Sequence, residues 1–147
     1  MQDRPTYAEL LEAVQRFLEA DAIPALEGTK KFHARVAANV LAIVRRELES
    51  EDAQLRAEWE RLDQLLSPER LPAAREAMRR RLDDRTAHLC DRIRAGDADS
   101  GAWRAAVLAH ARQTVVEKLA VANPKYLGAE IGPAVETANS PVGSHDT

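Results

Sequence analysis

The sequence has few aromatic residues and a single cysteine. Its 147 residues include two tryptophans, two tyrosines and two phenylalanines. A sheet core draws on aromatic and β-branched side chains, whereas small and unbranched apolar residues suit close helix packing. Cys90 cannot form an internal disulfide, which fits a reducing compartment. The composition therefore favours an all-α protein of the cytoplasm.

An excess of one charge and a long apolar run are also missing. The chain has 21 Lys and Arg against 24 Asp and Glu, with both signs mixed along it. Such a balance gives no long-range field that would recruit nucleic acid or an anionic membrane. No apolar run approaches the length of a membrane span, and no charged-then-apolar leader opens the chain. We therefore expect a soluble protein that binds neither nucleic acid nor membrane.

Motifs for catalysis, cofactors and metals are absent as well. The sequence contains no G-x-G-x-x-G, Walker A, G-x-S-x-G or H-E-x-x-H pattern. It has no Glu-x-x-His pair, and His88 and Cys90 diverge on a helix because they are two residues apart. The arginines of residues 75–85 are compensated by acids three or four positions away. We expect no catalytic residue, cofactor or metal, and a DNA-binding regulator ranks last.

What the chain does contain is a series of segments with helical apolar periodicity. Thr6 and Glu9 form a capping box at the start of the first helix, and Pro24 and Gly28 interrupt the pattern. Ser67 and Pro68 predict another helix start, and Pro72 can open that helix in its first turn. Helices are expected over about residues 6–20, 29–47, 51–66, 68–95 and 101–123.

The division of residues 30–66 into two helices is the least determined boundary. Ser50 can cap a new helix within the polar stretch Glu47–Leu55, but the apolar spacing continues through it, so one long helix is the alternative. Short connections favour antiparallel neighbours. The predicted fold is an up-and-down bundle of four or five helices, with residues 1–127 as one domain and 128–147 as a disordered tail.

One candidate site lies in the stretch KKFHARVAANVLAIVRREL, Lys30–Leu48. On a helical wheel, His33 falls near the middle of its apolar arc, which predicts that it points inward. It could be a base or ligand, or a neutral core histidine bonded to its surroundings. Arg35 and Asn39 lie one turn apart at the edge of the arc, where a polar groove could begin or where they serve packing alone.

A second candidate is Lys118, which lies with Thr114 within the apolar arc of the last helix. A lysine in this setting can anchor an anion or act as an amine of lowered pKa, or it can pair with an acid such as Glu47. If His33, Asn39 and Lys118 converge, they would line a polar pocket between the second and last helices.

Several stretches resemble a known family: RPTYAELLEAVQRFLEADAIPALEG, FHARVAANVLAIVRREL, LCDRIRAGD and VVEKLAVANPKYL. Over Arg4–Leu127 they are similar to a small, uncharacterised bacterial family classed as a domain of unknown function. The resemblance implies proteins encoded beside aminoglycoside-phosphotransferase-like kinases and acyl-CoA dehydrogenases, and it supplies no catalytic residues. Its most recognisable stretches contain His33, Arg35, Asn39, Lys118, Asn123 and Pro124.

Three functions follow from these observations. The first is a non-catalytic interaction or accessory module for a partner enzyme, of the acyl-CoA dehydrogenase or phosphotransferase-like kind, with a homodimer as one form of assembly. The alternative is a binding protein or enzyme for a small anionic acyl or phosphate ligand. The third is a DNA-binding regulator, which would need an uncompensated basic surface.

Overall fold

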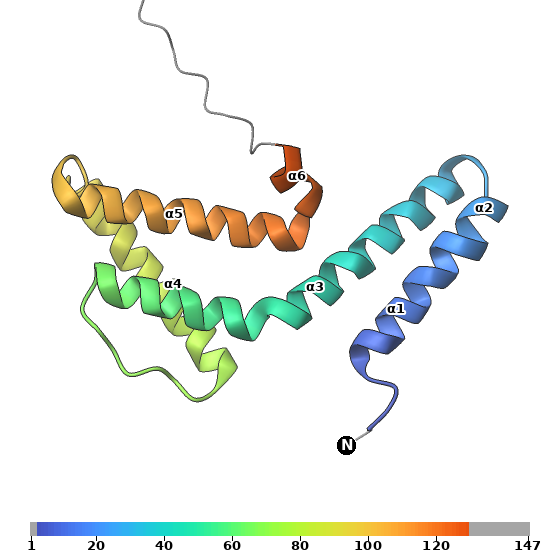
Figure 1. The fold of residues 1–147 in the computed structure, drawn as a ribbon, viewed down its shortest axis with the longest axis horizontal. Helices are drawn as coiled ribbons and strands as arrows, with labels where there is room; N and C mark the ends of the chain where they lie inside the picture. Colours follow the sequence, from blue (N-terminus) through green and yellow to red (C-terminus); the bar gives the residue numbers. More distant parts are fainter. Residues whose placement is uncertain (1–2, 130–147) are drawn as a thin grey trace, which may run out of the picture.

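The structure of the chain is a computed structural model that describes residues 3–129. This part of the chain is helical and contains no strand, which confirms the all-α prediction. The elements in Figure 1 are α1 (Tyr7–Phe17), η1 (Leu18–Ala22), α2 (Ile23–Ala25), α3 (Gly28–Leu65), α4 (Arg75–Arg94), α5 (Gly101–Ala122) and α6 (Pro124–Ala129). Nearly all of the predicted tail lies outside the described residues.

The first helix begins as predicted but continues further. The Glu9 N–H donates to the Thr6 hydroxyl at 3.3 Å, and the Thr6 N–H donates to the Glu9 carboxylate at 2.7 Å. The helix then runs through the π-helical η1 into α2, and Ile23 keeps helical angles. The predicted interruption within residues 21–29 is confirmed, since the helix ends at Ala25 and Leu26 is extended, but Pro24 does not displace Ile23 from helical geometry as predicted.

Residues 28–65 form one helix of 38 residues, so the predicted break near Ser50 is wrong. The Ser50 hydroxyl donates back to the Arg46 carbonyl at 2.7 Å inside the helix and does not cap a new one. The predicted cap at Thr29 is also wrong. Gly28, at φ +53°, makes the turn into α3 one residue earlier.

The helix α4 starts at Arg75, seven residues after the predicted start at Pro68. The connection before it is held by side chains of the flanking helices: the Glu69 N–H donates to Asp63 at 3.2 Å, and Arg85 donates to the Ser67 carbonyl at 3.2 Å. The predicted stop at Gly96 is confirmed, since Gly96 has φ +94° and its N–H donates to the Ile93 carbonyl.

The elements are arranged along α3 (Figure 1). The helix α1 packs antiparallel against its N-terminal half, whereas α4 and α5 pack against its C-terminal half. The hydrophobic core lies in the second region and consists of Trp59, Leu62, Leu65, Met78, Leu82, Leu89 and Val107. In the first region α1 has no buried residue, and the buried apolar residues of α3 are Ala38 and Ala42. No helix in residues 3–129 is long and apolar enough to cross a membrane.

Candidate functional site

The four predicted site residues fall into two places. His33, Arg35 and Asn39 lie on the N-terminal half of α3 and are exposed, so the prediction that His33 points inward is wrong. Lys118 lines a cavity between α3 and α5, where a polar pocket was expected. Neither His33 nor Asn39 lines this cavity. His33 is about 15 Å along the helix from Ile43, where the α3 side of the cavity begins. The three side chains therefore do not converge.

The cavity is part of a groove between α3, α4 and α5. Both α4 and α5 contact α3, yet no Cα atom of α4 lies within 8 Å of a Cα atom of α5. Two cavities, of about 410 Å³ and 530 Å³, occupy the space left between them. The residues that line both are Leu55, Glu58, Arg79, Thr114 and Lys118. We call this space the central groove.

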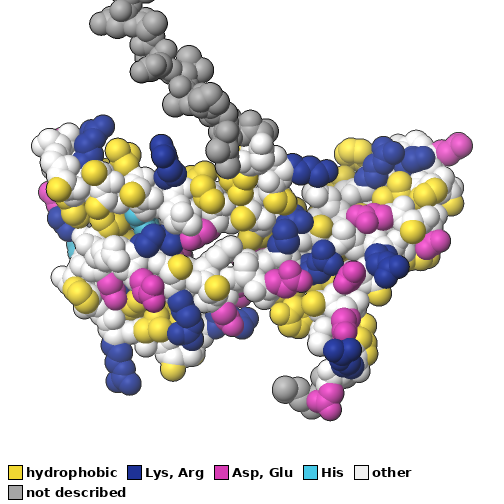
Figure 2. Space-filling view, viewed as in Figure 1, with side chains coloured by type: hydrophobic (Ala, Val, Ile, Leu, Met, Phe, Trp, Pro, Cys, Tyr) yellow, Lys and Arg dark blue, Asp and Glu magenta, His cyan; other side chains and the backbone are white. Residues whose placement is uncertain are grey.

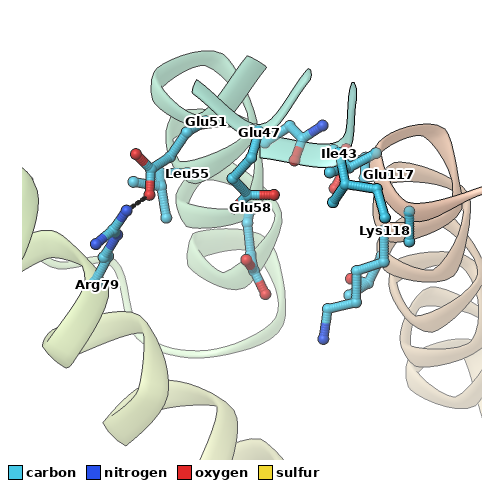
Figure 3. Close-up of a pocket in the computed structure, with 12 residues that line it drawn as sticks. Ile43, Glu47, Glu51, Leu55, Glu58, Arg79, Glu117 and Lys118 are labelled. Carbon is cyan, nitrogen blue, oxygen red and sulfur yellow. Dashed lines mark ion pairs between the residues drawn. The ribbon is translucent and has the colours of Figure 1, made fainter. Parts of the chain in front are cut away.

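Acidic residues dominate the polar end of the central groove (Figure 3). Glu51 is buried and forms an ion pair with Arg79, and Glu117 binds the Arg61 guanidinium through two hydrogen bonds of 2.8 and 2.7 Å. Four carboxylates line the smaller cavity: Glu47, Glu51, Glu58 and Glu117. The arginine partners neutralise two of them, Glu51 and Glu117.

Glu58 and Lys118 are the charged residues that extend into the open space (Figure 3). Burial raises the pKa of the Glu58 carboxyl, an effect that Arg61 and Lys118 partly offset. The expected ion pair between Lys118 and Glu47 does not form, although both residues line the same cavity. An acidic lining with one open ammonium gives no support to an anionic acyl or phosphate ligand.

His110 is the other titratable group enclosed by the groove. Its side chain, on α5, is 7% exposed and lines the larger cavity. Burial lowers the pKa of the imidazole and the nearby Arg61 lowers it further, while Glu117 partly offsets both effects. Among residues 3–129, no three His, Cys, Asp or Glu side chains are grouped to hold a metal ion.

The feature that the sequence interpretation missed is an apolar surface on the α1–α3 hairpin. Large apolar side chains that are 40–63% exposed recur along one stripe of α1 and along one stripe of α3. These residues are Tyr7, Leu10, Val14 and Phe17 on α1, and Phe32, Val36, Val40, Val44 and Leu48 on α3. Figure 2 shows hydrophobic side chains between charged ones at the surface of this hairpin. We call the nine residues the hairpin face.

The signal for the hairpin face was present in the sequence but was assigned to the wrong environment. Phe32, Val36 and Val40 form the apolar arc that predicted a buried surface around His33. Periodicity shows that one side of a helix is apolar. It does not show whether the same chain covers that side, and here it does not.

Comparisons with known proteins support the resemblance in part. Residues 24–126 match the family described as Domain of unknown function (DUF6285). The match begins within α2, so residues 4–23, which the resemblance had included, lie outside it. No curated protein and no solved structure matches the chain. Because the match covers more than half of the sequence, the chain belongs to the DUF6285 family of domains of unknown function.

Proposed function

We propose that the protein is a non-catalytic interaction module and that its binding surface is the hairpin face. One observation carries the proposal: nine large apolar side chains are exposed in two stripes on one helical hairpin. At exposed fractions of 40–63%, they leave on the order of 900 Å² of side-chain surface in water. Each stripe, with about half of this surface, is comparable with the largest apolar patch of a typical monomer, about 300–600 Å², and such patches are often functional.

The weak core of the hairpin points to the same function. Most helical stability in proteins comes from the packing of an apolar face, and α1 buries no residue against its own chain. Its contacts with α3 include an ion pair between Glu12 and Arg45 at 3.7 Å and a hydrogen bond from the Tyr7 hydroxyl to the Leu48 carbonyl at 3.4 Å. Exposed ion pairs contribute about 0–1 kcal/mol. A partner that covers the hairpin face would supply the missing packing.

The resemblance described above suggests an enzyme of the acyl-CoA dehydrogenase or phosphotransferase-like kind as the protein served by this module. The module would act as an accessory by holding or stabilising that enzyme. The alternative of an anionic-ligand protein is not carried further, since its three predicted residues are separated and the central groove is acidic.

Site-specific photo-crosslinking in the native host tests the proposal. A benzoylphenylalanine that replaces Phe17 should crosslink to protein, because Phe17 lies in the hairpin face. The matched control replaces Val115, which is 54% exposed on α5 outside that face. Mass spectrometry of the products identifies what covers the face. Absence of crosslinks from position 17, or identical products from both positions, would refute the proposal.

A further inference from the structure

We infer that the hairpin face is covered by a second copy of this chain, which packs antiparallel about a two-fold axis at Val40. This inference rests on the proposed function, because it names the partner of the same surface. A two-fold interface must be self-complementary: if residue i of one copy contacts residue j of the other, then j of the first contacts i of the second. The spacing of the α3 stripe and the polar residues beside it meet this requirement.

The spacing of the α3 stripe is symmetric about Val40. Its apolar residues occur at every fourth position from 32 to 48, with Val40 in the centre. Successive residues of the stripe are turned by about 40° around the helix, so Val36, Val40 and Val44 share one side, whereas Phe32 and Leu48 point to its two flanks. In an antiparallel pair centred on Val40, Val36 lies beside Val44 of the second copy.

The same register explains two polar residues on this apolar side of α3. At about 100° per residue, His33 and Glu47 both point within about 20° of the direction of Val40. Both are exposed. Because they lie seven residues on either side of Val40, the antiparallel pair places His33 of each copy opposite Glu47 of the other. An imidazole N–H can donate to a carboxylate, so each dimer would contain this pair twice.

The surroundings of the α3 stripe also fit a second copy. The chain's own α5 does not obstruct the stripe at its end. Arg46, about half a turn around α3 from Leu48, donates to the Val121 carbonyl of α5 at 2.7 Å. Glu47 also lines the smaller cavity, so a second copy seated here would border the central groove.

Disulfide trapping tests the inference on the full chain. In a Cys90→Ala background, which removes the one native cysteine, Val40→Cys should form a disulfide-linked dimer under mild oxidation. Two residues 40 would meet at the axis, where their Cα atoms can approach within the roughly 4.4–6.8 Å of a disulfide. The matched control Val115→Cys, equally exposed on α5, should yield at least tenfold less linked dimer.

The register is tested with Val36→Cys and Val44→Cys. A mixture of the two variants should form the linked dimer, while each variant alone should stay at the level of the control. Linkage of Val36→Cys to itself would overturn the antiparallel register. If Val40→Cys links no more than Val115→Cys and the wild type sediments as a monomer, the second copy is refuted. A photo-crosslink from position 17 to a different protein would still support the interaction module, so the two failures are distinguishable.

Discussion

At the scale of single residues, Arg85 shows how a charge is accommodated in the core. Its side chain is 2% exposed and lies over the Trp59 ring, with 4.7 Å between the guanidinium carbon and the ring centroid. One guanidinium nitrogen pairs with the Asp63 carboxylate at 2.7 Å, and another donates to the Ser67 carbonyl. A buried charge is stable only with such partners. Arg85 thereby ties the end of α3 and the following connection to α4.

Replacement of Arg85 with alanine should lower the free energy of unfolding by about 2–4 kcal/mol. The change removes the stacking on Trp59, leaves Asp63 without its ion pair and opens a cavity. Urea denaturation measures the loss. Arg80→Ala is the control, because Arg80 is exposed and pairs only with the exposed Glu76. Equal losses in both variants would show that Arg85 has no special structural role.

The raised pKa of Glu58 predicts that replacing this residue with glutamine stabilises the chain in a pH-dependent way. Since burial raises its pKa above the ordinary 4.5, the folded chain binds this proton more tightly than the unfolded chain does. The free energy of unfolding therefore falls as the pH rises through the window between the ordinary and the raised pKa. Glu58→Gln should be more stable than the wild type at pH 7–8, and this difference should disappear near pH 4.

Thermal unfolding across this pH range measures the effect of Glu58→Gln. The exposed Glu60, on the same helix, provides the control Glu60→Gln. A stabilisation by Glu58→Gln that is constant from pH 4 to pH 8 would mean that ionisation of Glu58 is not its cause.

The proposed pair of His33 and Glu47 predicts a charge-reversal effect on dimerisation. Glu in place of His33 would face Glu47 of the second copy, so His33→Glu should weaken the dimer by about 10-fold or more through like-charge repulsion. The double variant His33→Glu with Glu47→Lys should recover most of the loss. Sedimentation equilibrium gives the dissociation constants. Equal weakening by His33→Glu alone and by the double variant would argue against this contact.

At the scale of elements, start and stop signals with a local hydrogen-bonding mechanism were predictable. The capping box at Thr6 and the stop at Gly96 both occur as expected, because their partners lie within a few residues. The starts assigned to Ser50 and Pro68 failed. Ser50 bonds within a continuing helix, and the non-helical segment around Pro68 is held by Asp63 and Arg85 from neighbouring helices. Such distant partners cannot be inferred from local residue order.

The N-terminal half of α3 should depend on the second copy for part of its protection. Because Val36, Val40 and Val44 are exposed in the single chain, its amide hydrogens should exchange faster when the dimer is disrupted. Val40→Glu places a charge at the proposed axis, so it should speed exchange in this half of α3 while exchange in α4, which packs on the core, stays unchanged. Hydrogen exchange followed by mass spectrometry measures both segments. Unchanged exchange in this half of α3 would indicate that the hairpin is stable alone.

At the scale of the whole molecule, the sequence predicts the helix content, but it does not predict which apolar helix surfaces the same chain buries. Composition and periodicity predicted the all-α fold. The apolar arc around His33 was assigned to the core, since a wheel cannot distinguish a surface covered by the same chain from one that another chain covers. The structure separates the two cases: Leu62 is fully enclosed, whereas Val40 is about half exposed although it belongs to the same helix. Of the four candidate site residues, the structure places Lys118 beside a cavity and His33, Arg35 and Asn39 away from it.

Binding of a second copy to the hairpin face doubles the molar mass of the protein, which sedimentation equilibrium measures over a range of concentrations. We expect twice the chain mass of 16.3 kDa for the wild type at micromolar concentration, and a single chain mass for Val40→Glu with an unchanged helical circular-dichroism spectrum. A wild-type protein that stays at the mass of one chain at all concentrations would refute the dimer.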